Sequence, residues 1–268
     1  MASYCDARQR NGIWQLRIDD IDGPRSVPKS ADAIQRSLDI YGFEWDGPIV
    51  WQSKRQDLYQ HALHTLVESG LIFACQCSRR QLPAGTIYPG TCRTAKLSPT
   101  SPSTQYAIKD HALRCRMLST VCLNDAVQGN HRIDLAQTKG DTIVWRRDGL
   151  VSYALACAVD DSDRVTHVVR GADLMDSTGV QIGILKALGR PAPDYAHIPV
   201  AIDTQGDKLS KHSKSESVAT LATLPTLLRA WKFLGQAELE PESVAEFWHQ
   251  STIQWQMQRV PVAKRLQQ

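Results

Sequence analysis

Three cysteines that lie close together in the sequence could bind a metal ion. Cys75 and Cys77 flank a single glutamine, and Cys92 follows fifteen residues after Cys77. Glycine and proline residues between them allow the chain to fold back, so that three sulfur atoms could converge as in tetrahedral zinc sites. No histidine or further cysteine lies between Cys77 and Cys92, and Tyr88 is the side chain there that could supply an oxygen anion. The spacing alone leaves open a zinc site or three reduced structural cysteines.

Two lysines form a second group that could do chemistry. Lys208 and Lys211 flank a leucine and a serine after the turn-forming stretch 204–207. Each ammonium group is a mobile point charge, so two of them on a glycine-led loop can bind a polyphosphate. Lysine-rich surface loops are common, and a solvated loop is the alternative for this motif taken by itself.

A third group centres on Arg170, which begins the motif Arg-Gly-Ala-Asp-Leu at the end of a short predicted strand. Side chains at the carboxyl ends of parallel strands face the crevice in which such sheets bind ligands. A guanidinium there can hold a carboxylate through two parallel hydrogen bonds. Tyr153 lies in the apolar stretch before it, and Asp160 and Asp161 follow that stretch. The alternative is that Arg170 pairs with one of these aspartates for structural reasons.

The composition excludes several classes of protein. The chain has 268 residues, of which 42% are hydrophobic and 22% charged, as in ordinary globular proteins. The longest apolar run, 151–159, is shorter than the roughly 20 residues of a membrane-spanning helix. Without an apolar signal core at the start, we expect a cytoplasmic protein. The net charge of +3 permits an RNA partner but does not require one.

The odd number of cysteines, seven, argues against a disulfide framework in a chain without an export signal. Cys115, Cys122 and Cys157 lie in apolar or alternating stretches. We therefore expect each of these three to be a small buried hydrophobic residue.

Strands and helices in alternation must position these groups. Apolar patterns predict strands at 13–18, 151–159, 166–169 and 198–202. Apolar periodicity, with Ser30 as a cap and glycines as stops, predicts helices at 30–41, 56–68 and 175–188. Short strands and turns are expected over 106–147, and an exposed linker over 96–105. The C-terminal part is helical in propensity, with aromatic residues available for packing. This order predicts an α/β fold with a mostly parallel sheet.

Taken in order, the motifs of the chain resemble one family over nearly its whole length. They are 17–22, 51–53, the cysteine loop with its tyrosine, 147–153, 169–174 and 208–211. In this order they resemble the catalytic domain of the glutamyl-tRNA synthetases, and most of all the truncated paralogues called glutamyl-Q tRNA(Asp) synthetases. The chain stops soon after 208–211, with no room for an anticodon-binding domain. It also reads RGADL at 170–174, where the full synthetases typically carry RGEDH.

The resemblance implies a fold and a division of the chain. The fold would be a class I synthetase Rossmann-like catalytic domain with an inserted zinc-containing subdomain and C-terminal helices, its first strand missing from this sequence. The division would be 1–70 as the first part of the catalytic domain, 71–147 as the inserted subdomain, 148–215 as the second part, and 216–268 as the helical segment.

The resemblance also implies a two-step reaction. L-Glutamate attacks the α-phosphate of ATP to give glutamyl-adenylate, and the glutamyl group then passes to the cyclopentene-diol of queuosine at the wobble position of tRNA(Asp). Such phosphoryl chemistry depends mostly on positioning and charge stabilisation. Mg²⁺ would accompany ATP, and we expect a monomer.

The same resemblance assigns roles to individual residues. Lys211 would act on the ATP phosphates with Lys208 supporting the loop, and Asp19, Tyr153 and Arg170 would bind glutamate, Asp19 at its amino group. One structural Zn²⁺ would be bound by a four-residue set: Cys75, Cys77, Tyr88 and Cys92.

Three departures from the family pattern stand out. The sequence begins within what resembles the helix that follows the family's first strand and HIGH-type signature, so we expect the true start to lie upstream and the 268-residue chain to be inactive or poorly folded. Asp19 stands in place of a glutamate that is one methylene longer. The segment 160–166 is one residue shorter than usual and lacks a glycine.

Two alternatives to the ligase function stay open. They are a truncated, inactive remnant that binds glutamate, zinc or RNA, and a glutamyl-tRNA synthetase-like fragment.

Overall fold

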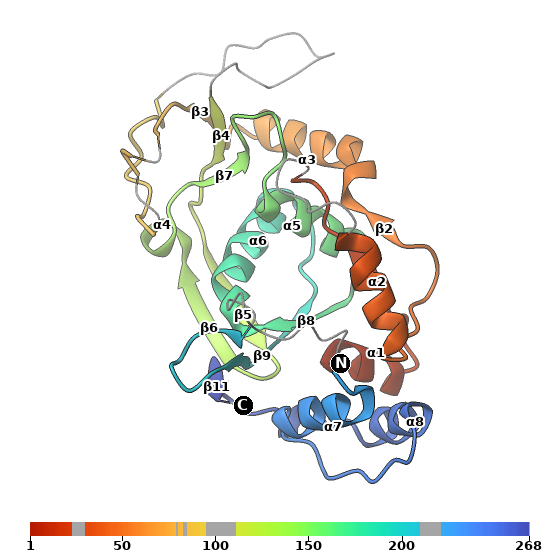
Figure 1. The fold of residues 1–268 in the computed structure, drawn as a ribbon. Helices are drawn as coiled ribbons and strands as arrows, with labels where there is room; N and C mark the ends of the chain where they lie inside the picture. Colours follow the sequence, from red (N-terminus) through yellow and green to blue (C-terminus); the bar gives the residue numbers. More distant parts are fainter. Residues whose placement is uncertain (23–29, 79, 83–84, 95–110, 210–220, 268) are drawn as a thin grey trace.

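The computed structural model describes residues 1–22, 30–78, 80–82, 85–94, 111–209 and 221–267. Its strands and helices alternate along much of the chain, as the α/β prediction requires (Figure 1). Among the described residues the strands form four sheets, of which the largest has the order β6-β5-β9-β8. The predicted linker at 96–105 and the residue Lys211 lie outside the described residues.

The first part of the chain contains α1 (Ala2–Gln9), β1 (Arg17–Ile18), α2 (Ser30–Ile40), β2 (Val50–Trp51) and α3 (Gln56–Glu68). The helices at 30–41 and 56–68 are confirmed. The strand at 13–18 is shorter than predicted, because only its last two residues pair, in parallel, with β2. The α3 helix packs through Tyr59, Ala62, Leu63 and Leu66, all of them buried.

The middle of the chain consists of short strands and turns, as predicted. An antiparallel sheet is formed by β3 (Ile72–Cys75), β4 (Ala112–Cys115) and β7 (Thr142–Trp145). The hairpin of β5 (Thr120–Asp125) and β6 (Gly129–Asp134) leads into the short helix α4 (Leu135–Thr138). Through β5 this hairpin joins the parallel pair β8 and β9.

The predicted strand at 151–159 is wrong. Tyr153–Arg164 forms the helix α5, and Ser152 caps it by accepting a hydrogen bond from the backbone N–H of Leu155 at 3.3 Å. Every residue from Leu155 to Asp161 is buried. A segment that is apolar on all sides has neither helical nor strand periodicity, so its pattern could not distinguish the two structures.

The elements after α5 follow the predicted order. They are β8 (His167–Gly171), α6 (Met175–Ala187), β9 (Asp194–Ile198) and β10 (Val200–Ile202). The predicted strand at 198–202 is therefore divided between β9 and β10. The β8 strand pairs in parallel with β9, and Arg170 lies beside His197 in the register. The α6 helix packs against α5 in the main hydrophobic core, where Leu66, Leu155 and Ile184 are fully buried.

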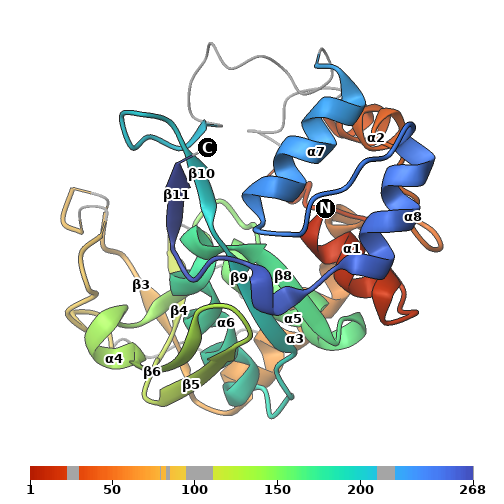
Figure 2. The same ribbon diagram turned by 90° about the horizontal axis from the view of Figure 1, so that it is seen from below.

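The C-terminal part contains α7 (Thr223–Phe233) and α8 (Val244–Gln254), and its aromatic residues pack with those of the first part. Tyr4 of α1 contacts Trp248 of α8 at 4.7 Å between ring centroids. Figure 2 shows α7 and α8 beside α1. One strand was not predicted: β11 (Arg265–Gln267) pairs in parallel with β10. No helix in the described part of the chain is long and apolar enough to cross a membrane.

Candidate active site

The predicted metal ligands lie together where β3 leads into the following loop. The Sγ atoms of Cys75, Cys77 and Cys92 are all within 4.8 Å of one another, and those of Cys77 and Cys92 are 3.6 Å apart. The hydroxyl oxygen of Tyr88 lies 3.8 Å from Cys75 Sγ and accepts a hydrogen bond from the backbone N–H of Cys92 at 2.7 Å. The fold therefore brings together the three sulfur atoms and the one phenolic oxygen.

The surroundings of this cluster favour negative charge on Cys92, whereas burial, together with hydrogen bonds to the neighbouring ligands, raises the pKa of Cys77 to about 11 and also raises that of Tyr88. Arg114 donates from Nε to Cys75 Sγ at 3.3 Å, and its guanidinium carbon lies 4.1 Å from the centre of the Tyr88 ring. Burial raises the pKa of the Cys92 thiol, but hydrogen bonds from the backbone of Gln76 and from Tyr88 outweigh it and lower that pKa to about 7. Three thiolates and one anionic oxygen are a donor set that suits tetrahedral Zn²⁺.

Asp19, Tyr153 and Arg170 come from three different elements. Asp19 follows β1, Tyr153 is the first residue of α5, and Arg170 lies in β8. Burial, and then the neighbouring Cys157, raise the pKa of the Tyr153 hydroxyl, whereas the charge of Arg170 lowers it and that of Asp19 raises it. The charges of Arg170 and Asp19 thus both act on this hydroxyl, and Tyr153 is a neutral phenol at physiological pH.

Among the contacts of the described residues, Arg170 forms no ion pair with Asp160 or Asp161, although its charge is one of the influences that lower the pKa of Asp161. Arg170 donates from Nη2 to Thr178 Oγ1 at 2.5 Å and to Gln181 Oε1 at 2.7 Å. Its guanidinium also lies 5.4 Å from the centre of the Tyr195 ring. These contacts orient Arg170 without neutralising its charge.

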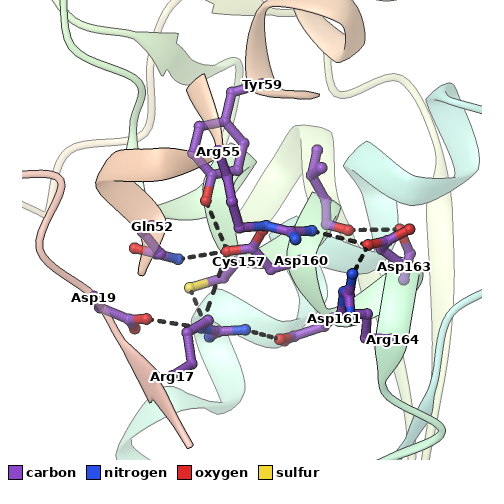
Figure 3. A network of polar contacts seen from close by, with 12 residues as sticks. Arg17, Asp19, Gln52, Arg55, Tyr59, Cys157, Asp160, Asp161, Asp163 and Arg164 are labelled. Atoms are coloured by element: carbon purple, nitrogen blue, oxygen red, sulfur yellow. Dashed lines mark hydrogen bonds and ion pairs between the residues drawn. The ribbon is translucent and has the colours of Figure 1, made fainter. Parts of the chain in front are cut away.

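Asp160 and Asp161 instead belong to a buried ionic network that the sequence did not reveal (Figure 3). Arg17 donates to Asp161 at 2.6 Å, to Asp19 at 2.7 Å, and to the sulfur of Cys157 at 3.6 Å. Burial lowers the pKa of Arg17, but the charges of Asp161 and Asp19 raise it by more. Arg17 therefore stays charged and fixes the Asp19 carboxylate relative to α5.

Asp160 is the centre of the second half of the network. Its carboxylate accepts hydrogen bonds from Arg55 Nε at 2.7 Å, Gln52 Nε2 at 2.8 Å and the Tyr59 hydroxyl at 2.8 Å. Arg55 also donates to Asp163 at 2.9 Å. Gln52 belongs to the 51–53 motif, and this contact explains how that motif is joined to α5.

Of the two predicted phosphate-binding lysines, the structure describes one. Lys208 Nζ lies 2.8 Å from Asp173 Oδ2, and both side chains are part-exposed, at 42% and 39%. Asp173 belongs to the 170–174 motif, so this ion pair brings the lysine loop to the end of β8. Lys211 lies outside the described residues.

The chain resembles known proteins over nearly its whole length. The family described as tRNA synthetases class I (E and Q), catalytic domain, matches residues 1–253. A glutamyl-Q tRNA(Asp) synthetase of Aromatoleum aromaticum is 42% identical, over 97% of this chain and 84% of that protein. Another, of Chromobacterium violaceum, is 40% identical, over 97% of this chain and 88% of that protein.

Solved structures show the same fold. The glutamate-tRNA synthetase of Elizabethkingia anophelis superimposes with a TM-score of 0.77 at 21% sequence identity, over 98% of this chain and 62% of that one. The chain thus spans less than two thirds of this longer protein, and the likeness concerns the fold. The match to the family and the identity to curated relatives are more specific. The chain belongs to the class I tRNA synthetases (E and Q), and within them to the family of the glutamyl-Q tRNA(Asp) synthetases.

Proposed function

We propose that this protein is a ligase that activates L-glutamate with ATP and transfers the glutamate to queuosine at the wobble position of tRNA(Asp). Two curated relatives, which this chain matches over 84% and 88% of their length, carry the name of that activity. The observation within this chain that best supports it is Arg170, a guanidinium held in β8 by Thr178 and Gln181, whose charge acts, as does that of Asp19, on the Tyr153 hydroxyl. An amino acid with a second carboxylate needs such a combination of cationic, neutral and anionic groups.

Each of these three side chains suits one part of glutamate. Arg170 uses Nε and Nη2 for protein contacts, and among the described residues no acceptor is found for Nη1, which suits a carboxylate of the substrate. Tyr153, neutral and 43% exposed, can donate its hydroxyl proton to a carboxylate oxygen. Asp19, whose position is fixed by Arg17, can accept from the substrate ammonium group.

The chemistry requires ATP beside the bound glutamate. A carboxylate oxygen of glutamate attacks the α-phosphorus, the bond from that phosphorus to the bridging oxygen breaks, and pyrophosphate leaves. Lys208, and Lys211 by resemblance, would stabilise the charge on the phosphates. Mg²⁺ bound with ATP would neutralise phosphate charge. A queuosine hydroxyl then attacks the carbonyl carbon of the adenylate, and AMP leaves.

We infer that a single Zn²⁺ is bound by Cys75, Cys77, Tyr88 and Cys92, and that it is structural. Four protein ligands fill a tetrahedral site and leave no position for substrate. The ion would hold the loop after β3 in place, close to the strand pairing of β3 and β4. It would take no part in the transfer of glutamate.

The proposed function is tested by the fate of labelled glutamate. The 268-residue chain and, beside it, a chain extended to an upstream in-frame start are incubated with ATP, Mg²⁺ and radiolabelled glutamate, with tRNA(Asp) that carries either queuosine or guanosine at the wobble position. We expect label only on the queuosine-bearing tRNA, bound there rather than at the 3′ end. Label at the 3′ end of a glutamate tRNA would instead indicate an ordinary glutamyl-tRNA synthetase.

Activation is measured separately, as glutamate-dependent exchange between ATP and pyrophosphate without tRNA. That assay compares the 268-residue chain with a chain extended to an upstream in-frame start. The expectation that the shorter chain is inactive stays a prediction that this comparison decides. Exchange in neither chain would count against the proposed function.

A further inference from the structure

A buried carboxylate and imidazole lie behind Arg170, and no step proposed above uses them. Asp125 ends β5, and His197 lies in the neighbouring parallel strand β9. His197 Nδ1 and Asp125 Oδ2 are 2.5 Å apart, and both side chains are fully buried. A buried charged group is costly unless it is hydrogen-bonded, so this pair needs an explanation.

The two oxygen atoms of Asp125 have different partners. Oδ1 accepts three backbone N–H groups, from Gln128 at 2.8 Å and from Val127 and His197 at 3.0 Å each. Oδ2 faces His197 Nδ1 alone among the described contacts. Burial raises the pKa of Asp125, but the hydrogen bonds from His197 and from the backbone outweigh it, and the pKa is lowered. An ionised carboxylate can only accept, so the proton between the two groups lies on His197 Nδ1.

That proton fixes what the opposite side of the ring can do. With Nδ1 protonated in a neutral imidazole, Nε2 is an acceptor. It lies 3.4 Å from Arg170 Nε, which is always a donor, so Nε2 must accept there. It also lies 2.7 Å from Thr178 Oγ1, whose single proton is shared between Nε2 and the carbonyl oxygen of Leu174 at 3.0 Å. Thr178 Oγ1 in turn accepts from Arg170 Nη2 at 2.5 Å. The Nε and Nη2 groups of Arg170 are thereby engaged, whereas Nη1 has no acceptor within the described part of the chain.

We propose that Asp125 and His197 are positioning residues, which hold Arg170 with Nη1 toward the substrate carboxylate by fixing the tautomer of His197. Neither residue touches glutamate in this assignment. The functional consequence rests on the proposed function, since it assumes that Arg170 binds glutamate. The tautomer and the orientation of Arg170 can be measured without substrate.

Asp125→Asn tests the proposal directly. The Asn oxygen can keep the three backbone hydrogen bonds of Oδ1, whereas its NH₂ group replaces Oδ2 and donates to His197 Nδ1. The ring proton must then move to Nε2, where it faces the N–H of Arg170 Nε, as when a buried aspartate behind a histidine is replaced in other enzymes. Asp134→Asn is the matched control, because Asp134 also accepts a backbone N–H, that of Gln137, but lies beside no histidine among its described contacts.

The first readout is NMR of the full chain, labelled with ¹⁵N on histidine and arginine. In the unsubstituted protein and in Asp134→Asn we expect the Nδ1–H tautomer at His197 and a slowly exchanging Nε–H at Arg170. In Asp125→Asn we expect the Nε2–H tautomer and faster exchange at Arg170. An Nε2–H tautomer in the unsubstituted protein, or an unchanged Arg170 signal in Asp125→Asn, would overturn the proposal.

The second readout is calorimetric binding of glutamate and of ATP. Asp125→Asn should weaken glutamate binding by about tenfold and leave ATP binding unchanged, since one hydrogen bond to a charged group is misplaced. Thr178→Val should weaken glutamate binding similarly while His197 keeps its tautomer. Equal losses for both ligands would indicate a merely structural role. If the unsubstituted chain binds no glutamate, the proposed function fails, and the NMR result still decides the positioning pair.

Discussion

Arg17 and Asp161 are 144 positions apart in the sequence, yet Arg17 Nη1 lies 2.6 Å from Asp161 Oδ1. Through Nε the same guanidinium holds Asp19 at 2.7 Å. An exposed carboxylate in the proposed glutamate site is thus anchored to a buried carboxylate of α5. Burial raises the pKa of Asp161 above its ordinary value, and the charge of Arg17 and its hydrogen bond offset part of that rise.

We expect the contacts of Asp160 in the charge network to contribute strongly to the stability of the folded protein. This carboxylate is 3% exposed and has three hydrogen-bond donors, Arg55, Gln52 and Tyr59. Asp160→Ala leaves Arg55 buried without its main partner, which should reduce the free energy of unfolding by about 3–5 kcal/mol. Urea denaturation of the full chain measures this change.

Asp163→Ala is the control for Asp160, because Asp163 also pairs with Arg55 but its side chain is 44% exposed. Exposed pairs contribute about 0–1 kcal/mol, so the control should unfold at nearly the urea concentration of the unsubstituted chain. Similar losses for the two variants would show that burial does not determine the strength of this network.

The zinc site predicts one metal ion per chain. Elemental analysis of the purified protein should find one equivalent of zinc, and Cys77→Ser should lose most of it. Tyr88→Phe keeps the three sulfur ligands and removes only the oxygen, so it should bind zinc more weakly without abolishing binding. Cys122→Ser is the control, since Cys122 is an exposed cysteine of β5 that belongs to no ligand cluster in the described structure. Equal zinc content in all four proteins would contradict the assignment.

Thiol reactivity distinguishes the remaining cysteines. Cys122 was expected to be buried, but it is exposed and should react with iodoacetamide at pH 8. Cys115 and Cys157 are buried as expected, and burial raises the pKa of each thiol to about 12. At pH 8 about one in ten thousand of these thiols would be ionised, so they should stay unmodified. Peptide mass spectrometry measures the modification, and rapid labelling of Cys157 in the folded protein would contradict its burial.

The predictions that the structure confirms rest on patterns of residues that are close together in the sequence. The α3 helix was predicted over 56–68, where the structure has it, because its apolar period and terminal glycine are local signals. The cysteine cluster was readable for the same reason, since its ligands lie within 75–92 and the loop that joins them contains turn-forming residues. The aromatic residues of the C-terminal helices pack in a common core as expected.

Contacts between distant segments could not be predicted in this way. Most of the 151–159 segment is buried, with Tyr153 exposed, and its apolar residues run without a break, so periodicity did not separate helix from strand. Asp125 and His197 are 72 positions apart, and nothing in either neighbourhood signals the other. Among the long-range partners, Asp160 and Asp161 were noticed, but they were considered only as alternative partners of Arg170, whereas they pair with Arg55 and Arg17.

The link from Arg17 to Asp19 yields a last prediction about substrate binding. Asp19→Asn removes the charge proposed to meet the ammonium group of glutamate, while the side chain, 39% exposed, contributes little to the core. We expect about a tenfold weaker binding of glutamate, measured by calorimetry, with unchanged ATP binding and urea midpoint. Asp39→Asn, at an exposed aspartate of α2, should change none of these values.

Arg17→Lys should act on the same site by a different route. A lysine offers a point charge but cannot reach Asp19, Asp161 and Cys157 together with one planar group, so both stability and glutamate binding should fall. If Arg17 acts on glutamate through Asp19, the variant that carries both Arg17→Lys and Asp19→Asn should bind glutamate no more weakly than Asp19→Asn alone. Losses in binding that simply add would mean that Arg17 and Asp19 influence glutamate independently, and the anchoring of Asp19 by Arg17 would have no role in substrate binding.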